Sequence, residues 1–405
     1  MTRHTPAITG IGLLTPAGLD WSTTWAAMLA GQSQARTDPA MAGLPVDFSC
    51  RIDGFDAAHA IGRDAWRLDR FCQLAIAASR QAVADAGLDP REWDPTRVGV
   101  VIGVGSNSME TWRREFRRAF DGKRVSPLAL PRSVPNMAAG EVAIALDARG
   151  PNLGVTTACS SGATAIATAA MLLETGACDI VITGGAEAPS ASDMTNLCFD
   201  AMTALSHRTH DPAGASRPFE ADRDGFVLGE GAGILVLERH DHAAARRARV
   251  RARLMGYGMS ADAGHPTAPD PQGCGLQASM RAALKHAGLV PADIHHVNAH
   301  GTATLANDRT EAHALRQVFG EPPPVTASKS ILGHAIGGAA AIEAAISVLT
   351  LEHQMIHPTA NLDRQDPEID LDVVHKIPRP ARMTTVLSNA AAFGGQNTTL
   401  VIAKA

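Results

Sequence analysis

One cysteine lies where a strand-like run meets a helix-like run. The stretch TTACSSGATAIATAAMLLETGACDIVITGG, from Thr156 to Gly185, places Cys159 at the start of a long alanine-rich segment. At a helix N-terminus, unpaired backbone N–H groups and the positive end of the helix dipole stabilise a thiolate and lower the pKa of the thiol. The same N–H groups can hold an oxyanion when the sulfur attacks a carbonyl. Many cysteines are inert buried side chains, which we expect of Cys178 and Cys198, but this context favours a nucleophile at Cys159.

Two further segments supply partners for a nucleophile. VNAHGTATLANDRTEAHAL places His300 directly after a strand, and SKSILGHAIGGAAAIEAA places Lys329 and His334 around a turn that opens a helix. Strand-to-helix junctions are where α/β folds place their chemistry. Together with Cys159, these three side chains indicate acyl transfer.

A zinc site is the competing interpretation of Cys159, His300 and His334. None of the three segments has a local two-ligand spacing such as HxxxH or CxxC, so we expect no metal site. The glycines of GHAIGGAAA and AFGGQN form neither a Walker nor a Rossmann fingerprint, and we therefore expect no bound nucleotide.

Apolar strand-like runs alternate with segments of helical period along the chain. Strands are predicted to begin at Ala7, Val98, Leu153, Asp179, Gly231, Val250, Ile294, Thr384 and Thr398, all of them buried. Helices are predicted near residues 68–86, 160–176, 273–287, 309–318 and 337–352. This alternation predicts an α/β protein with mixed or parallel sheets.

Two internal echoes indicate a duplicated unit. AVADAGLDP, from Ala82, resembles ALKHAGLVP, from Ala283, and each closes a helix before a strand. GATAIATAAMLL, from Gly162, resembles GAAAIEAAISVL, from Gly338, and both are small-residue helices that follow a glycine. Because the echoes occur in the same order, we predict two α/β halves, residues 1–249 and 250–405.

Composition excludes several functional classes. The 405 residues carry a formal net charge of −5, with 45% hydrophobic and 19% charged residues. Nucleic-acid binding needs a clustered basic face, and we interpret the arginines at 113–118 and 246–253 as solvated helix faces, with a docking patch for an acidic partner as the weaker alternative. No signal peptide or membrane span is evident, and the cysteines lack metal or disulfide spacing. We expect a soluble cytoplasmic protein.

Five ordered motifs closely resemble those of the β-ketoacyl-[acyl carrier protein] synthases, condensing enzymes of the thiolase superfamily. They are TACSSG around Cys159, RPFEADRDGFVLGEGAGILVLE from Arg217, NAHGTATLAND from Asn298, KSILGHAIGGAAAIE from Lys329 and SNAAAFGGQN from Ser388. The likeness covers nearly the whole chain, and the Cys–His–His set resembles the elongating synthases. It implies the thiolase fold, with duplicated βαβαβαββ halves in five α-β-α-β-α layers.

The resemblance also implies a mechanism. Cys159 would take an acyl chain from the phosphopantetheine arm of an acyl carrier protein as a thioester, by ping-pong catalysis. Its backbone N–H and that of Phe393 would form the oxyanion hole. His300 and His334 would hydrogen-bond the malonyl thioester as carbon dioxide leaves, and Lys329 would orient His334.

Further residues match family positions around the substrate. Thr302 and Thr304 match threonines that bind the pantetheine arm, although both could also cap a turn. Phe199 matches an aromatic residue of the acyl tunnel, although an ordinary core phenylalanine is nearly as good an interpretation. Phe393 resembles the gatekeeper between acyl pocket and malonyl site, with Gly394 beside it.

The resemblance implies a supporting polar network. Glu343 falls on the helix after His334, where a buried carboxylate needs a partner, and in the family it belongs to a network that sometimes holds a monovalent cation. Asn298, Ser388 and Asn389 could share that network. Asp308 and Glu311 could join it or simply favour a helix N-terminus.

The chain departs from the family pattern at two positions. The gate loop commonly reads GFGG, and here Ala392 replaces the first glycine, which removes access to positive φ and could make the gate stiffer. Ala303 stands where the family often has serine. Neither change removes a catalytic group.

We therefore predict decarboxylative Claisen condensation on a carrier protein, in a type II polyketide or polyene system, with primary fatty-acid elongation as the alternative. The expected assembly is a homodimer or a heterodimer with a chain-length-factor-like subunit, without bound cofactor, nucleic acid or membrane. A non-catalytic chain-length-factor-like partner is disfavoured because Cys159, His300 and His334 are intact. A coenzyme A thiolase is disfavoured because its second cysteine is absent from the motifs.

Overall fold

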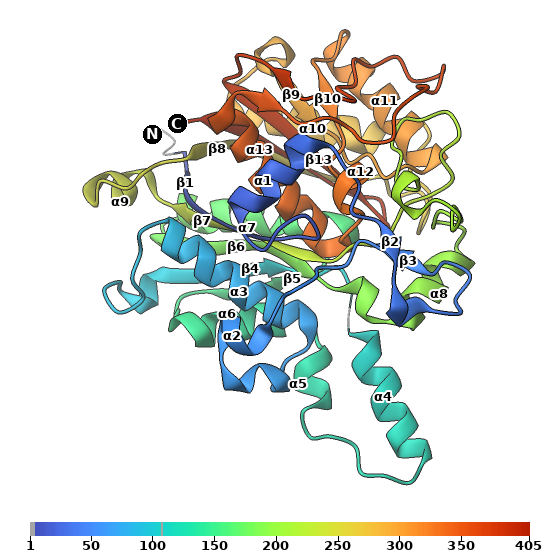
Figure 1. Ribbon diagram of the computed structural model, residues 1–405. Coiled ribbons are helices and arrows are strands. Elements are labelled where there is room, and N and C mark those ends of the chain that lie inside the picture. Colours follow the sequence, from blue (N-terminus) through green and yellow to red (C-terminus); the bar gives the residue numbers. More distant parts are fainter. Residues whose placement is uncertain (1–4, 107) are drawn as a thin grey trace.

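Ten strands join edge to edge in the computed structural model, which describes residues 5–106 and 108–405 (Figure 1). Five come from the first half of the chain: β1 (Ala7–Leu14), β4 (Val98–Gly103), β5 (Asn152–Val155), β6 (Ile180–Glu187) and β7 (Gly231–Glu238). Five come from the second half: β8 (Ala252–Ala261), β9 (His296–Asn298), β10 (Val325–Thr326), β13 (Thr385–Ala392) and β14 (Gln396–Lys404). All nine predicted strands are present, and β10 was not predicted.

The two halves have the same strand order. The order is β5-β4-β6-β7-β1 in the first half and β10-β9-β13-β14-β8 in the second, so both run third, second, fourth, fifth, first along their own half. The directions also match, because β4 is parallel to β5 and β6 as β9 is to β10 and β13, and the two remaining pairings in each half are antiparallel. The predicted duplication is confirmed. Among the described residues, the strand pairing that joins the halves into one sheet is short, with Ala7 and Ile8 of β1 opposite Arg253 and Ala252 of β8.

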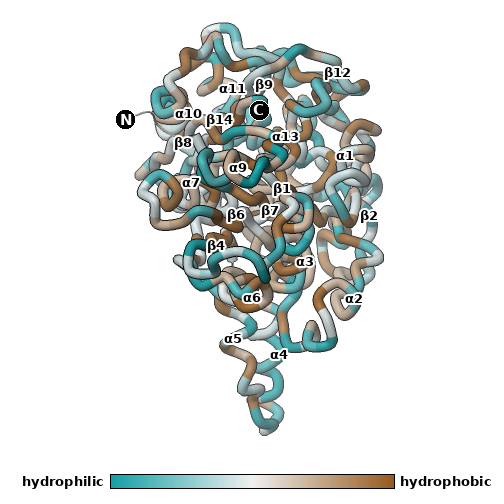
Figure 2. Tube along the Cα trace, turned by 90° about the vertical axis from the view of Figure 1, so that its left-hand side faces the viewer, coloured by the Kyte–Doolittle hydropathy of each residue, from teal (hydrophilic) through white to brown (hydrophobic). Residues whose placement is uncertain are grey.

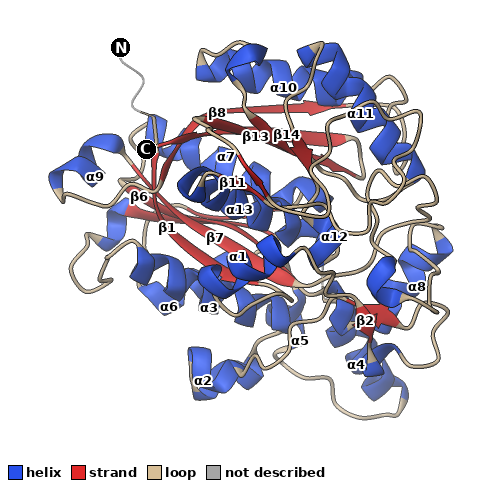
Figure 3. Ribbon diagram, turned by 45° about the horizontal axis from the view of Figure 1, so that its top comes forward, coloured by secondary structure: helices blue, strands red, loops and turns tan. Residues whose placement is uncertain are grey.

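The principal helices complete five layers (Figure 3). Outer helices α3 (Arg70–Asp85) and α6 (Met137–Leu146) pack on the first-half strands, and α10 (Cys274–Ala287) with α11 (Leu305–Phe319) lies on the far side of the second-half strands. The middle layer is α7 (Ser161–Glu174) and α13 (Ala339–His353), which contact each other and strands of both halves. The five predicted helices and the five-layered thiolase architecture are confirmed.

The middle layer is closely packed because its helices are built from small residues. Every residue of α13 from Ala339 to Leu351 is buried, and a Cβ added to Gly162 of α7 would lie 2.7 Å from the Cβ of Ala341. In Figure 2 the strands β4, β6 and β7 run brown through the centre, whereas the loop at α9 is teal. The apolar stretch Ile336–His353 is long enough to cross a membrane, but 89% of it is buried inside the protein, as in a core helix.

The remaining elements are short or peripheral. They are α1 (Trp21–Ala30), α2 (Ala57–Ile61), α4 (Met109–Phe120), α5 (Ala129–Ser133), α8 (Asp193–Ala201), α9 (His240–Ala245), α12 (Lys329–Leu332), β2 (Arg36–Thr37), β3 (Phe48–Ser49), β11 (Met355–Ile356) and β12 (Arg379–Pro380). Helix α4 projects from the body of the molecule beside α5 (Figure 1). Its Arg117 and Arg118 are exposed, as predicted, but Arg113 forms an ion pair with Asp193 of α8.

One predicted strand has the wrong environment. Strand β5 was predicted to be buried, yet Asn152, Leu153 and Gly154 are exposed. The reason is its place in the sheet, because β5 pairs only with β4 and forms one edge. The apolar segment of β5 is therefore exposed to solvent at a sheet edge, where a partner can bind.

Candidate active site

Cys159 lies in a tight turn between β5 and α7. The turn is a short 3-10 helix, Ala158–Ser160, in which Ala158 has a φ of 46°, a left-handed conformation that costs energy for a residue other than glycine. Neighbouring hydroxyls hold it, because Ser161 Oγ donates to the Ala158 carbonyl at 2.6 Å and accepts from the Thr157 N–H at 2.9 Å. The local sequence thus fixes the direction of the Cys159 side chain.

Cys159 opens into a cavity of about 390 Å³. Predicted site residues around it are Cys159, Phe199, His300, Thr302, Thr304, His334 and Phe393, whereas Gly394 is outside the lining. Met202, Thr203, Thr267 and Pro269 also line the cavity and were not predicted. The structure therefore brings a thiol, two imidazoles and two threonine hydroxyls to one space from both halves of the chain.

The Cys159 thiol is harder to ionise than expected. Burial raises its pKa to about 11, and the nearby Glu187 carboxylate acts in the same direction. The charge of Lys329 and the backbone N–H groups of Phe393 and Cys159 lower the pKa, but less strongly. The prediction of a lowered pKa at the helix N-terminus is therefore wrong, because desolvation outweighs the favourable charges. The sulfur is protonated at neutral pH and must lose its proton as it attacks.

Both histidines are buried and neutral at pH 7. His300 follows β9 and His334 follows α12, and their ring centroids are 5.6 Å apart at an interplanar angle of 85°. Burial lowers the pKa of each ring well below its usual value, and the charge of Lys329 lowers both further. Neutral imidazoles can donate a hydrogen bond without carrying a charge.

Lys329 contacts His300 rather than His334. Its Nζ donates to the His300 carbonyl at 2.6 Å and lies 3.3 Å from His300 Nδ1. The expectation that Lys329 orients His334 is thus corrected, although its charge reaches both rings. An ammonium group can only donate, so His300 Nδ1 accepts and the neutral ring carries its proton on Nε2.

Aromatic packing positions His334. Its backbone N–H donates to the Val227 carbonyl at 2.7 Å, and its ring meets Phe226 edge-on with centroids 5.2 Å apart. Phe226 contacts Phe199 at 5.3 Å, and Phe199 contacts Phe393 at 6.2 Å. A row of rings therefore runs from one histidine to the gate loop, and Phe199 belongs to it.

Two carboxylates of α11 hold the turn after His300. Glu311 accepts hydrogen bonds from the N–H groups of His300 at 2.8 Å and Gly301 at 2.9 Å. Asp308 accepts from the Ala303 N–H at 3.2 Å and pairs with the buried guanidinium of Arg223 at 3.1 Å. Burial raises the pKa of both carboxyl groups. Their role exceeds the predicted preference for a helix N-terminus, because they fix the backbone that carries the histidine.

The expected supporting network is divided into separate contacts. Glu343 Oε1 accepts from Lys329 Nζ at 2.6 Å, and burial raises the pKa of Glu343 to about 7 against the opposing effect of that lysine. Asn298 Oδ1 instead accepts from Ser328 Oγ at 2.9 Å, and Asn389 Nδ2 lies 3.3 Å from Glu311. Ser388 lies opposite Asn298 in the β9–β13 register. No direct hydrogen bond among these described residues links Asn298, Ser388 or Asn389 to Glu343.

The gate loop is the turn of the β13–β14 hairpin. Ala392 pairs with Gln396, which leaves Phe393, Gly394 and Gly395 between the strands. Gly394 and Gly395 have φ values of 83° and 68°, so the conformational freedom of glycine is used there. Among the described residues, Ala392 is not one of those with positive φ, and its replacement of glycine is compatible with the ladder.

Glu187 is a buried acid that the sequence did not single out. It ends β6, and its Oε2 accepts from the N–H groups of Gly105 at 2.6 Å and Ser106 at 3.0 Å. Burial raises its pKa to about 7, although those N–H groups and that of Gly337 lower it. Glu187 thus ties the ends of first-half strands to the segment that follows His334. The only sequence signal is a carboxylate that closes the apolar run IVITGGAE.

Metal-binding geometry is absent from residues 5–106 and 108–405, where no group of three or more His, Cys, Asp or Glu side chains could hold an ion. The six cysteines are free thiols.

A buried thiol beside two neutral imidazoles, on a duplicated thiolase fold, defines a condensing enzyme that transfers acyl groups. The family model "Beta-ketoacyl synthase, N-terminal domain" matches residues 5–243, and "Beta-ketoacyl synthase, C-terminal domain" matches residues 251–363. The chain belongs to the β-ketoacyl synthase family, and its activity is that of a β-ketoacyl-[acyl carrier protein] synthase.

Named relatives agree with this assignment. The chain is 41% identical to 3-oxoacyl-[acyl-carrier-protein] synthase 2 of Staphylococcus aureus (strain COL), over 98% of this chain and 97% of the relative. Its structure matches the ishigamide ketosynthase/chain length factor with a TM-score of 0.93, at 34% identity and full coverage of both chains (100%). It also matches AntDE:AntF, a type II polyketide acyl-carrier protein in complex with its ketosynthase, with a TM-score of 0.91, at 28% identity and 100% coverage of both chains.

Proposed function

We propose that this enzyme extends an acyl chain held on Cys159 by decarboxylative condensation with malonyl-[acyl carrier protein], in a type II polyketide or polyene pathway. The observation that carries the reaction is the single cavity shared by Cys159, His300 and His334. In the first step the Cys159 sulfur attacks the acyl thioester of a phosphopantetheine arm. The N–H groups of Cys159 and Phe393 hold the oxyanion, and the thiol proton passes to the departing pantetheine sulfur.

In the second step a malonyl thioester enters the same cavity. Its carboxylate leaves as carbon dioxide, and the electron pair moves onto the thioester oxygen, which the N–H groups of His300 and His334 stabilise as an enolate. The enolate carbon attacks the acyl carbon on Cys159, the carbon–sulfur bond breaks, and the sulfur takes up a proton. The product is a β-ketoacyl chain on the carrier protein. Thr302 and Thr304, which line the cavity, would bind the pantetheine arm.

In this scheme, Lys329 and the buried carboxylates determine the tautomer and the charge of the histidines. Lys329 fixes the His300 tautomer that presents Nε2–H, and Glu343 balances the lysine charge. The single ammonium of Lys329 then faces two carboxylates, those of Glu343 and Glu311, and the charge of Glu311 raises the pKa of Glu343. A monovalent cation would balance the extra negative charge. It could bind Glu343 Oε2, which has no hydrogen-bond partner among the described residues. No other cofactor enters the proposal.

Two pathways compete for this chemistry. The likeness to the ishigamide ketosynthase/chain length factor and to AntDE:AntF supports the polyketide assignment. The 41% identity to the Staphylococcus aureus synthase supports primary fatty-acid elongation as the second candidate.

The partners follow from the reaction and from one exposed edge. An acyl carrier protein delivers both substrates. Strand β5 leaves one edge unpaired with Leu153 exposed, which supports pairing with a second copy or with a chain-length-factor-like subunit. We place the enzyme in the cytoplasm, with neither nucleic acid nor membrane as a partner.

The test is intact-mass spectrometry of the carrier protein after incubation with its acyl-loaded and malonyl-loaded forms. The protein is assayed alone and with a chain-length-factor-like neighbour, and a Cys159→Ala variant serves as the control. A β-ketoacyl product from the protein alone supports a homodimeric elongase, and a product only with the neighbour supports a heterodimer. Acylation of Cys159 without any product in either mixture would overturn the roles given to the histidines.

A further inference from the structure

Two buried histidines, His296 and His357, have no role in the proposed reaction. Neither is more than 1% exposed, and burial lowers the pKa of His296 to about 3 and that of His357 to about 4, so both rings are neutral at pH 7. Neither nitrogen of His296 has a hydrogen-bond partner among the described residues, whereas both nitrogens of His357 lie close to polar atoms. His357 therefore has contacts through which it can act on other groups.

His357 begins a short segment, residues 357–360, that lies along the segment carrying Lys329. Three hydrogen bonds join the two segments, from Thr326 Oγ1 to the His357 carbonyl at 3.0 Å, from the Ala327 N–H to Thr359 Oγ1 at 3.1 Å and from the Ala360 N–H to Ser330 Oγ at 2.9 Å. Every residue in both segments is buried. Residues 357–360 therefore hold the backbone on which Lys329 stands.

Side-chain contacts continue from His357 to strand β9. His357 Nε2 lies 3.1 Å from Ser328 Oγ, and Ser328 Oγ donates to Asn298 Oδ1 at 2.9 Å. The other ring nitrogen, Nδ1, lies 3.0 Å from the Pro358 carbonyl, which sets the plane of the ring. His357, Ser328 and Asn298 are each at most 1% exposed, and such contacts are strong in a buried environment of low dielectric constant.

This chain of contacts ends beside both members of the Lys329–His300 pair. Ser328 directly precedes Lys329, and Asn298 ends β9 two residues before His300. Lys329 Nζ donates to the His300 carbonyl at 2.6 Å and lies 3.3 Å from Nδ1 of that residue. Because a hydrogen bond weakens steeply when its distance or angle changes, the spacing of these two backbone segments decides whether Lys329 fixes the His300 tautomer.

We propose that His357 is a positioning residue for the Lys329–His300 pair and that it acts through Ser328. This inference rests on the proposed function and adds to it a residue that lies outside the five ordered motifs. While His357 Nε2 contacts Ser328, Lys329 keeps the His300 tautomer that presents Nε2–H to the malonyl thioester. Loss of that contact shifts Lys329 and weakens the stabilisation of the enolate.

The two steps of the reaction distinguish such positioning from general structural support. Acylation uses the Cys159 sulfur with the N–H groups of Cys159 and Phe393, whereas condensation needs the His300 ring. The charge of Lys329 still reaches Cys159 after a small shift, because a charge interaction falls only with the inverse of distance. A variant that loses the His357 contact should therefore acylate normally and condense slowly.

The test measures both steps in His357→Leu and His357→Gln. Acylation of Cys159 is followed by intact mass of the enzyme, and condensation by mass of the carrier protein at saturating malonyl-[acyl carrier protein]. We expect His357→Leu to condense roughly tenfold more slowly, the effect of one lost hydrogen bond, with an unchanged acylation rate. His357→Gln should recover most of the loss, because its amide can contact Ser328 as donor or acceptor.

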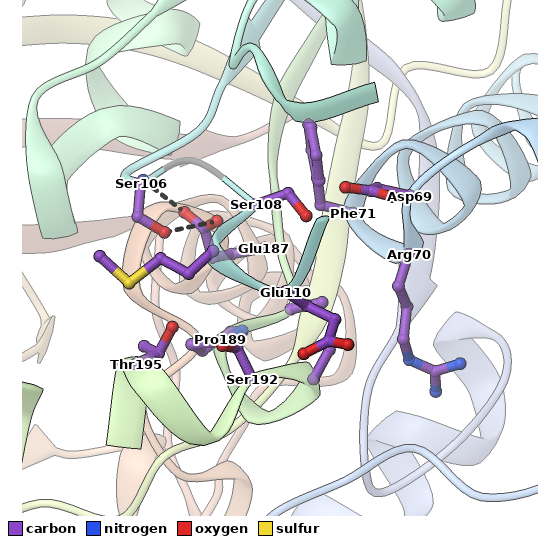
Figure 4. Close-up of a pocket in the computed structure, with 13 residues that line it drawn as sticks. Asp69, Arg70, Phe71, Ser106, Ser108, Glu110, Glu187, Pro189, Ser192 and Thr195 are labelled. Atoms are coloured by element: carbon purple, nitrogen blue, oxygen red, sulfur yellow. Dashed lines mark hydrogen bonds between the residues drawn. The ribbon is translucent and has the colours of Figure 1, made fainter. Parts of the chain in front are cut away.

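Three further variants test the route. Ser328→Ala removes the hydroxyl that His357 contacts, so it should reproduce the selective loss of condensation. His296→Leu is the matched control, because it replaces an equally buried ring that has no hydrogen-bond partner among the described residues. Ser106→Ala is the control for a lost serine contact, since Ser106 Oγ donates to Glu187 at 3.1 Å at the ends of first-half strands (Figure 4). Both controls should leave the condensation rate unchanged.

Equal slowing of acylation and condensation in His357→Leu, or an equal loss in His296→Leu, would overturn the positioning role and show that the ring only fills space. Failure of His357→Gln to recover condensation would also overturn it. If His357→Leu does not fold, Ser328→Ala gives the same comparison of the two steps without emptying the volume of the ring. Failure of the unaltered enzyme to condense, despite acylation of Cys159, would instead overturn the proposed function.

Discussion

At the residue scale, the pKa of the Cys159 thiol is set by burial rather than by the N-terminus of the helix. The Cys159 pKa of about 11 reflects a desolvated thiol, opposed by Lys329 and reinforced by Glu187. Below that pKa the thiolate fraction falls about tenfold per pH unit. The resting enzyme therefore holds a thiol that ionises only while it reacts, and this protects it from indiscriminate alkylation.

This balance predicts the pH dependence of alkylation. The rate of iodoacetamide labelling at Cys159 should rise about tenfold per pH unit from pH 7 to pH 10. Glu187→Gln removes a charge that raises the pKa, so it should label faster at every pH in that range. Peptide mapping separates Cys159 from the exposed Cys198. A labelling rate that is already flat at pH 8 would contradict the raised pKa.

The buried pair of Lys329 and Glu343 gives a second prediction. Lys329→Ala leaves Glu343 without its partner, and we expect the free energy of unfolding to fall by about 3–5 kcal/mol. Loss of the His300 tautomer should lower the condensation rate about 100-fold. Denaturant unfolding and product mass measure the two effects.

A double variant separates folding from chemistry. Lys329→Met combined with Glu343→Gln removes both charges, so stability should largely return while condensation remains impaired. Recovery of both properties together would mean that Lys329 acts only as a structural residue.

The residues of the active site could be predicted from the sequence, but the contacts between them could not. Cys159, His300, His334 and Phe393 stand in ordered motifs, and the structure brings them to one cavity. The contact of Lys329 with His300 joins positions far apart in the chain, and no local pattern encodes it. Glu187 was missed as a support, and the contacts of Glu311 were not foreseen, because a carboxylate carries no sequence signal that it will be buried against backbone N–H groups.

At the element scale, the middle-layer helices α7 and α13 need small residues where they meet, because there is no room for larger side chains between them.

Long, periodic helices such as α3 and α13 could be predicted, because many residues contribute to their pattern. The helices α4 and α8 were not among the predicted helices, although α4 is strongly amphipathic, and an ion pair between Arg113 and Asp193 joins the two.

The α7–α13 contact yields a third prediction. Gly162→Ala should lower stability by about 1–3 kcal/mol and slow acylation, because the new methyl group meets Ala341 and shifts the Cys159 turn. Gly140→Ala on α6 is the control, since its Cβ would meet only the Met137 side chain, at 3.8 Å.

The control should become more stable, by about 0.5–1 kcal/mol, because alanine is the better helix residue. Thermal unfolding measures both variants. A stabilised Gly162→Ala protein would show that the helices can separate to admit a methyl group.

At the scale of the whole molecule, one edge of the ten-stranded sheet is open to a partner. Strand β5 presents an exposed backbone edge with Leu153 at 41% exposure. An unpaired edge of this kind readily adds another strand.

This edge gives a fourth prediction, on association. Leu153→Lys should weaken dimerisation at least about tenfold, since an edge lysine opposes strand pairing. Val290→Lys, at another exposed apolar residue, should leave it unchanged. Sedimentation velocity over a concentration series gives the comparison. Unaltered association of Leu153→Lys would place the interface elsewhere.

Strand β14 is the last element of the chain, yet it lies inside the sheet between β13 and β8. During translation, therefore, the second-half sheet cannot close until this strand has been made, and Phe393 precedes it by only a few residues. The nascent chain carries Cys159 for more than half of its synthesis without an assembled pocket around it. A stop codon just ahead of Gln396 would leave β8 and β13 without the strand that lies between them, so we expect such a late truncation to abolish folding of the second half.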